Sequence, residues 1–216
     1  MGVEKEFHRV KLFSGFIYRD KDIYQEVKAK LAGIFSPVDL ESGVFDFDFT
    51  TYYHEEMGTP LFRRFVSFKT LIPPEQLPDI KLLTNKIEIE SAAAGKRTIN
   101  LDPGYLSLAN VIIATTKNYY HRVPLQKGIY AHMEYVIKGK KICPLEWTYP
   151  DFKFPGYLDF FQELRELYKK QVKQKTEDRR QRTDDRGQKT DDRGQKTEDR
   201  RHKTEDRRKE GEKGRS

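Results

Sequence analysis

The sequence predicts an α+β domain in which helices cover one face of a mixed or antiparallel sheet, followed by a charged tail. Two patterns of apolar residues at helical spacing alternate with segments rich in Val, Ile, Phe and Tyr. Short strand-like segments follow the second helical pattern, and no apolar residue occurs after Val172. The order β-α-β-β-α-β with a trailing meander is compatible with a ferredoxin-like core to which a β-meander has been added.

The first half of the domain is expected to alternate strands with helices. Strict alternation of apolar and acidic residues in GVFDFDFT is typical of a half-buried strand. Asp20 or Asp22 can cap the first helical pattern, and Gly95 can end the second. The predicted elements are strands over 10–18, 43–50 and 61–72 and helices over 23–35 and about 75–94.

The second half is expected to begin with a strand that ends at NLD. A tight turn is predicted at Asp102, Pro103 and Gly104, with a positive φ at Gly104. The segment 107–117 is interpreted as a helix, although its β-branched Val-Ile-Ile run would also suit a strand. The remaining predicted elements are a hairpin formed by 122–125 and 129–137, a strand over 141–145 and a final helix over 156–172.

Gly128 decides the expected register of the hairpin. In a three-residue loop with Gly128 in the left-handed conformation, Arg122 faces His132 across the hairpin. A two-residue turn would instead bring His121 opposite His132, an arrangement in which two histidines can share a metal. Because Gly128 favours the three-residue loop, Arg122 beside His132 is expected to hold an anion or a carboxylate rather than a cation.

The charge of the chain is concentrated in the tail. Residues 175–209 form five charged heptads with 14 Lys and Arg against 10 Asp and Glu, so +4 of the net charge of +7 lies there. Without apolar residues to bury, these heptads cannot offset an ordering cost of roughly 1–2 kcal/mol per residue. We therefore expect one domain over 1–173 and a disordered tail over 174–216. The tail is interpreted either as a solvated spacer or as a weak contact for nucleic acid.

The cysteine count and the apolar runs bear on localisation. Cys143 is the only cysteine, which excludes an intrachain disulfide and a cysteine-built zinc site. No apolar run approaches the ~18 residues of a membrane span, and the N-terminus lacks the pattern of a signal peptide. A cytoplasmic location without membrane contact is expected.

Two motifs that suggest known chemistry fail on mechanism. Ala94-Gly95-Lys96-Arg97-Thr98 resembles the end of a P-loop, but Glu90 stands where the first glycine is needed and Arg97 replaces the hydroxyl residue that binds magnesium. His54-Glu55-Glu56 resembles the start of a zincin motif, but Gly58 stands where the second histidine is required. No metal site or particular cofactor is predicted from these residues.

The candidate site lies in the segments NLDPGY and TTKNYYHR, where polar side chains that can contact a ligand are concentrated. His121 is the candidate general acid–base residue because its ordinary pKa lies near neutrality. Asp102 is the second candidate catalytic residue and is expected to orient the bound anion together with Asn100. The remaining predicted site residues are ligand-binding: Asn100, Tyr105, Lys117, Arg122 and Trp147. The competing interpretation of NLDPGY is an ordinary Pro-Gly turn with its capping groups.

Residues 9–170 resemble a bacterial family described as domain of unknown function 4416. The resemblance rests on several motifs together, among them VKLFSGFIY, FDFTTYYHEEMG, KRTINLDPGY, ATTKNYYHR and WTYPD. Some members of that family carry a GTP-binding label, which the resemblance would extend to this chain.

Two functions from different classes follow from these expectations. The first is a domain that binds a phosphate-bearing small molecule or nucleotide, with or without catalysis. The alternative is a non-enzymatic RNA- or protein-binding module that uses Tyr119, Tyr120 and Tyr130 on a sheet face, with the tail as a tether.

Overall fold

A computed structural model describes residues 2–177 of the chain. The chain divides into two units at Lys169, and the first unit contains all the strands described below. Most of the predicted tail, residues 178–216, lies outside the described residues, and residues 170–177 are helical. Among the residues that the structure describes, no helix is long and apolar enough to cross a membrane.

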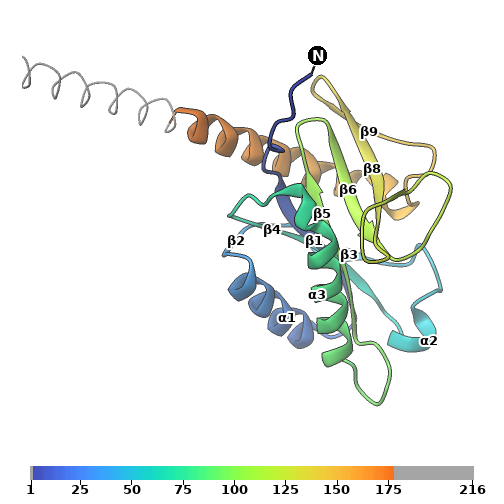
Figure 1. Ribbon diagram of the computed structural model, residues 1–216. Coiled ribbons are helices and arrows are strands. Elements are labelled where there is room, and N and C mark those ends of the chain that lie inside the picture. Colours follow the sequence, from blue (N-terminus) through green and yellow to red (C-terminus); the bar gives the residue numbers. More distant parts are fainter. Residues whose placement is uncertain (1, 178–216) are drawn as a thin grey trace, which may run out of the picture. The chain divides into compact units, whose positions relative to one another are not determined.

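The first unit is built on one antiparallel sheet (Figure 1). Its strands are β1 (Lys11–Tyr18), β2 (Val38–Glu41), β3 (Phe45–Asp46), β4 (Phe62–Phe68), β5 (Ile99–Leu106), β6 (Asn110–Thr115), β7 (Val123–Pro124), β8 (Tyr130–Lys138) and β9 (Lys141–Pro144). Their order across the sheet is β2-β4-β1-β5-β6-β8-β7, with β3 beside β4 and β9 beside β8.

The helices complete the βαββαβ core that the sequence predicts. Helix α1 (Lys21–Ile34) connects β1 to β2, and helix α3 (Leu77–Glu90) connects β4 to β5. The resulting order β2-β4-β1-β5, antiparallel throughout, is that of a ferredoxin-like core, and β6, β8, β7 and β9 extend it as a meander. The α+β fold class is therefore confirmed. The short elements are α2 (His54–Met57) and two 3-10 turns, Pro74–Gln76 and Asp151–Lys153.

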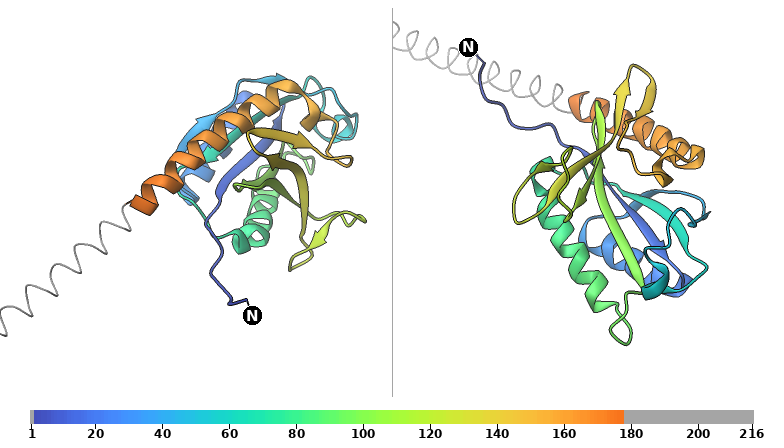
Figure 2. Two further views of the ribbon diagram at one scale, coloured as in Figure 1. Left: turned by 90° about the horizontal axis from the view of Figure 1, so that it is seen from above. Right: turned by 90° about the vertical axis from the view of Figure 1, so that its right-hand side faces the viewer.

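Both faces of the sheet are covered, which explains why every residue of β1 is buried. Leu12 and Phe16 of β1 pack with α1 and α3 in one core, and the side chain of Asp20 caps α1 by accepting from the N–H of Asp22. On the opposite face, Phe13 meets Phe161 with ring centroids 5.0 Å apart. Phe161 belongs to the helical residues 155–169 of the same unit, drawn in orange in Figure 2, which add a cover that the prediction of helices on one face did not include.

The predicted turn at Asp102-Pro103-Gly104 is wrong, because all three residues lie inside β5. Gly104 pairs with Phe13 of β1 and has no positive φ. Its role is steric: a Cβ there would collide with the backbone oxygen of Ile112 and lie 2.6 Å from Cζ of Phe13. Glycine is required at this position because neighbouring groups approach its backbone closely.

The predicted helix over 107–117 is also wrong, since its centre forms strand β6. Ser107 starts a tight connection by accepting from the backbone N–H groups of Ala109 and Asn110. The β-branched run that follows pairs with β5 and β8, so long-range pairing prevails over local helix propensity.

Other boundaries differ less from expectation. The predicted strand over 43–50 shrinks to the two residues of β3, and β2, which the sequence does not indicate, forms the sheet edge. In the hairpin, the N–H of Leu125 donates to the carbonyl of Ile129, and Gly128 has a φ of 74°. The predicted three-residue loop is thereby confirmed, and the register Val123 to Ala131 places Arg122 beside His132.

Candidate functional site

A fork between β5 and β6 creates the main concave site. The two strands pair only over 104–106 and 111–113, and the next step of the ladder would need an N–H that Pro103 does not have. Beyond the last paired residues, side chains of α3 form hydrogen bonds with the backbone of β5. Glu88 Oε1 accepts from the N–H of Leu101 at 2.7 Å, and Lys81 Nζ donates to the carbonyl of Leu101 at 2.8 Å. The end of β6 is thus free to diverge from β5.

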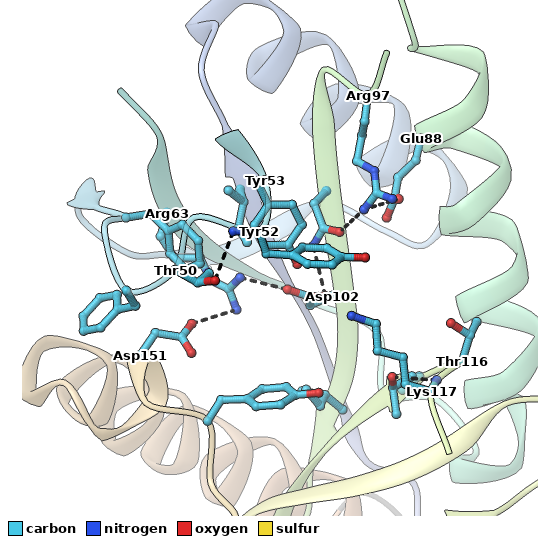
Figure 3. A pocket seen from close by; sticks show the side chains of 18 of the residues that line it. Thr50, Tyr52, Tyr53, Arg63, Glu88, Arg97, Asp102, Thr116, Lys117 and Asp151 are labelled. Carbon is cyan, nitrogen blue, oxygen red and sulfur yellow. Dashed lines mark hydrogen bonds and ion pairs between the residues drawn. The ribbon is translucent and has the colours of Figure 1, made fainter. Parts of the chain in front are cut away.

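The space at this fork is a cavity of about 730 Å³, large enough for a small-molecule ligand. Its walls come from β1, β4, β5, β6, α3 and the segments around residues 47–53 and 149–152. Aromatic side chains line much of it: Phe47, Phe49, Tyr52, Tyr53, Tyr149 and Phe152. The charged side chains that line it are Arg63, Lys81, Glu88, Arg97, Asp102, Lys117 and Asp151, most of them labelled in Figure 3.

Arg63 is the central charge of this cavity, and only 2% of its surface is exposed. Its Nη1 lies 2.8 Å from Oδ2 of Asp102, and its Nη2 lies 3.8 Å from Oδ2 of Asp151 (Figure 3). Burial raises the pKa of Asp151, while the guanidinium of Arg63 opposes that rise. The rings of Phe65 and Phe152 lie 4.8 and 5.3 Å from the guanidinium carbon, so the cation is enclosed by apolar surface.

A polar chain joins this buried charge to Arg97. Asn100 donates to Asp102 Oδ1 at 3.1 Å and accepts from Arg97 Nη1 at 2.8 Å. Arg97 also pairs with Glu56 at 3.2 Å, and its Nη1 lies 3.8 Å from Glu88. Burial raises the pKa of Glu88. The carboxylates and guanidinium groups of this wall therefore largely satisfy one another.

Lys117 differs from the other cations that line the cavity. Its side chain is exposed, and its ammonium lies 4.2 Å from the ring centroid of Tyr52, toward which it extends in Figure 3. Among the described residues, no carboxylate forms an ion pair with it. The neighbouring Thr116 is exposed at the same wall. Lys117 therefore offers a cation that is available to a bound anion.

A second polar cluster lies directly behind Tyr149 and centres on Arg122. Arg122 Nε donates to His132 Nδ1 at 3.1 Å, Nη1 donates to the carbonyl of Lys117 at 2.7 Å, and Nη2 donates to the hydroxyl of Tyr149 at 2.7 Å. Because a guanidinium can only donate, Nδ1 of His132 must be an acceptor and the ring proton must lie on Nε2. That nitrogen faces Glu134 Oε1 at 3.1 Å.

The two histidines of this cluster touch, although they are not opposite each other in the hairpin. His121 Nε2 lies 3.1 Å from His132 Nδ1. Burial, together with the charge of Arg122, lowers the pKa of His132 to about 4. Burial, His132 and Arg122 lower the pKa of His121 in the same direction. Both rings are therefore neutral at pH 7, while burial raises the pKa of Glu134.

The structure divides the predicted site residues into three groups. Asn100, Asp102 and Lys117 line the cavity. Arg122, His121 and Trp147 belong to the cluster behind it, where His121 stacks on Trp147 with centroids 5.0 Å apart. Tyr105 packs with the α1 and α3 core on the other face of the sheet.

Sequence reasoning missed several residues that build the cavity, above all Arg63, Glu88 and Asp151. In FRRFVSF, alternation places Arg63 on the same face as Phe65, which is a signal that this arginine is buried. No comparable signal marks Glu88, whose polar role depends on the strand edge that Pro103 leaves open.

Comparisons with known proteins support the family alone. No curated protein and no solved structure matches the chain. Residues 8–168 match the model of a family described as a domain of unknown function, DUF4416, and the chain belongs to that family.

Proposed function

We propose that this domain binds a phosphate-bearing small molecule, in particular a nucleotide, in the cavity at the fork of β5 and β6. The observation that carries the proposal is the position of Lys117 beside Tyr52 at the wall of an aromatic cavity, where no carboxylate among residues 2–177 forms an ion pair with its ammonium. A phosphate needs such a donor, and a flat ring next to it needs an aromatic surface.

The charges of the cavity favour a ligand with one phosphate over a polyphosphate. Arg63 and Arg97 are already paired with carboxylates, and Lys81 donates to the carbonyl of Leu101. The carboxylates of Asp102 and Asp151 lie on the same cavity wall and repel additional negative charge. Within the described part of the chain, Lys117 is therefore the one lining cation left available, and a single cation matches a single phosphate.

The first test is a thermal-shift panel on the full chain. It contains nucleoside monophosphates, ribose 5-phosphate, inorganic phosphate, and ATP and GTP with and without Mg²⁺. At about 100 times its dissociation constant, a ligand of the native state adds about 2.7 kcal/mol of stability and raises the melting temperature. We expect the largest shift from a nucleoside monophosphate. The absence of any shift across the panel would remove the proposal.

Substitution then decides where the ligand binds. Lys117→Ala is expected to weaken binding of the best monophosphate about tenfold, because it removes a charge-assisted contact. Lys140→Ala removes a lysine in the turn between β8 and β9 and serves as the matched control, with unchanged affinity expected. Equal affinity of Lys117→Ala and the unsubstituted chain would place the ligand elsewhere.

The alternative, a non-enzymatic RNA-binding module, is favoured by one observation. The side chains of Tyr119 and Tyr120 are 57% and 77% exposed in the loop that follows β6. Exposed rings can stack on unpaired bases. If this alternative is right, Tyr119→Ala and Tyr120→Ala should abolish binding of a single-stranded oligonucleotide, whereas Lys117→Ala should reduce it only slightly.

A further inference from the structure

We infer that Arg122 is the positioning residue of the cavity. It holds the loop after β6, which carries Lys117, and the segment after β9, which carries Tyr149, so that both side chains face the ligand. The inference rests on the proposed function for its role in binding. It departs from the expectation that Arg122 contacts a ligand, because Arg122 is absent from the cavity wall while both residues that it holds belong to that wall.

The geometry of Arg122 is that of a three-point anchor. Its three nitrogens reach one residue on each of three segments: Lys117 in the loop, His132 in β8 and Tyr149 in the segment that follows β9. A planar guanidinium can satisfy three acceptors at fixed angles, whereas an ammonium cannot. The bond to the backbone carbonyl of Lys117 fixes where the side chain of that residue begins.

The surrounding rings hold the guanidinium in place. Its carbon lies 5.9 Å from the ring centroid of Tyr119 and 5.7 Å from that of Tyr149. The ring of Tyr149 stacks in turn on His132, with centroids 4.7 Å apart and an interplanar angle of 11°. Tyr149 is therefore fixed on its face by His132 and at its hydroxyl by Arg122, which leaves its orientation in the cavity wall well determined.

A double-mutant cycle tests whether Arg122 acts through Lys117. The probe is the nucleoside monophosphate that binds best, measured by calorimetry on the full chain. We expect Arg122→Gln and Lys117→Ala each to weaken binding about tenfold, and the double variant to be no more than about twofold weaker than either single variant. Additive effects, about a hundredfold together, would show that Arg122 acts independently of Lys117 and would overturn the inference. So would unchanged affinity of Arg122→Gln.

Two further variants separate positioning from general stability. Arg122→Lys keeps the charge but loses the planar fork, so we expect it to fail to restore affinity. Arg165→Gln removes an arginine that is 8% exposed and donates to the carbonyl of Gly139, away from the cavity. It should lower the melting temperature while leaving the affinity for the monophosphate unchanged. An equal loss of affinity in Arg165→Gln would mean that the effect of Arg122 is merely structural.

A ligand-free measurement keeps the inference falsifiable if no monophosphate binds, an outcome that would count against the proposed function alone. Trp147 is the only tryptophan of the chain and stacks on His121, the neighbour of Arg122. Release of the loop in Arg122→Gln should expose Trp147 and raise its acrylamide quenching constant about twofold, with the far-UV spectrum unchanged. An unchanged quenching constant would show that Arg122 does not hold the loop.

Discussion

Arg63 and Asp102 form an ion pair of 2.8 Å in which the arginine is almost fully enclosed, although they are 39 positions apart in the sequence. The pair connects β4 to β5 across the intervening strand β1. In the sheet register, Arg63 is paired with Ile17 of β1 and Asp102 with Gly15 of β1. Gly15 makes this connection feasible: a Cβ at Gly15 would lie 3.0 Å from Nη2 of Arg63. The ion pair of Arg63 and Asp102, which lines the cavity, thus depends on a glycine in the central strand.

Asp102→Asn is expected to lower the free energy of unfolding by about 3 kcal/mol at pH 7. The substitution leaves the buried guanidinium of Arg63 with Asp151 at 3.8 Å as its nearest carboxylate, and breaking a buried pair costs about 3–5 kcal/mol. Urea unfolding measures the change. Asp46→Asn, an exposed carboxylate in β3, is the control and should change stability by less than about 0.5 kcal/mol. A loss below about 1 kcal/mol in Asp102→Asn would contradict the structural role of the pair.

Gly104→Ala should destabilise the fold by about 2–3 kcal/mol, because the new Cβ meets the backbone of Ile112 and the ring of Phe13. Gly33→Ala is the matched control. Gly33 lies in α1, and a Cβ there would have no neighbour within 4 Å. Alanine should stabilise this helix by about 0.5–1 kcal/mol. Thermal melts of both variants measure the difference, and the same sign for both would contradict the steric explanation.

The local pattern predicts those elements whose type and limits follow from residues close together in the sequence. Strand β1, helix α1 with its Asp20 cap and the hairpin register set by Gly128 all follow from spacing and turn chemistry. NLDPGY misleads because Pro-Gly usually marks a turn, whereas here Pro103 ends a ladder and Gly104 admits a close neighbour. These functions of the two residues depend on β6 and β1, which the local sequence does not contain.

The candidate site is only partly predictable for the same reason. Asn100 and Asp102 alternate along β5, so their common face can be derived from the sequence. Asn100 and Asp102 line the same cavity as Lys117 because β6 diverges from β5. Asp102 reaches Arg63 because β1 lies between β4 and β5 in the sheet. Those relations arise from contacts between distant segments.

The stability of the fold should decrease as the pH falls from 7 to 4, through His132. The folded pKa of about 4 is lower than the ordinary value of about 6.5, so the unfolded chain binds the proton first. The contribution of His132 is fully present above pH 6.5 and is lost as the pH falls toward 4, by up to about 3 kcal/mol. Burial raises the pKa of Glu134, which acts in the opposite direction because its folded form retains the proton at higher pH.

His132→Gln isolates that contribution. Urea unfolding at pH 7 and at pH 4 gives, for each protein, the loss in the free energy of unfolding between the two pH values. This loss should be larger for the unsubstituted chain than for His132→Gln. If the two lose equal stability, His132 does not stay neutral in the folded state.

The fluorescence of Trp147 should report the protonation of His121. The imidazole lies flat on the indole, with centroids 5.0 Å apart and planes 9° from parallel, and a protonated imidazole in this position quenches the excited indole. Because burial, His132 and Arg122 lower the pKa of His121, the quenching midpoint should fall below 6.5. Arg122→Gln removes one positive charge and releases the loop, so the midpoint should move upward and the amplitude of the transition should decrease, whereas His121→Gln should abolish the transition. A midpoint at or above 6.5 in the unsubstituted chain would contradict the lowered pKa of His121, and an unchanged midpoint in Arg122→Gln would show that Arg122 does not act on His121.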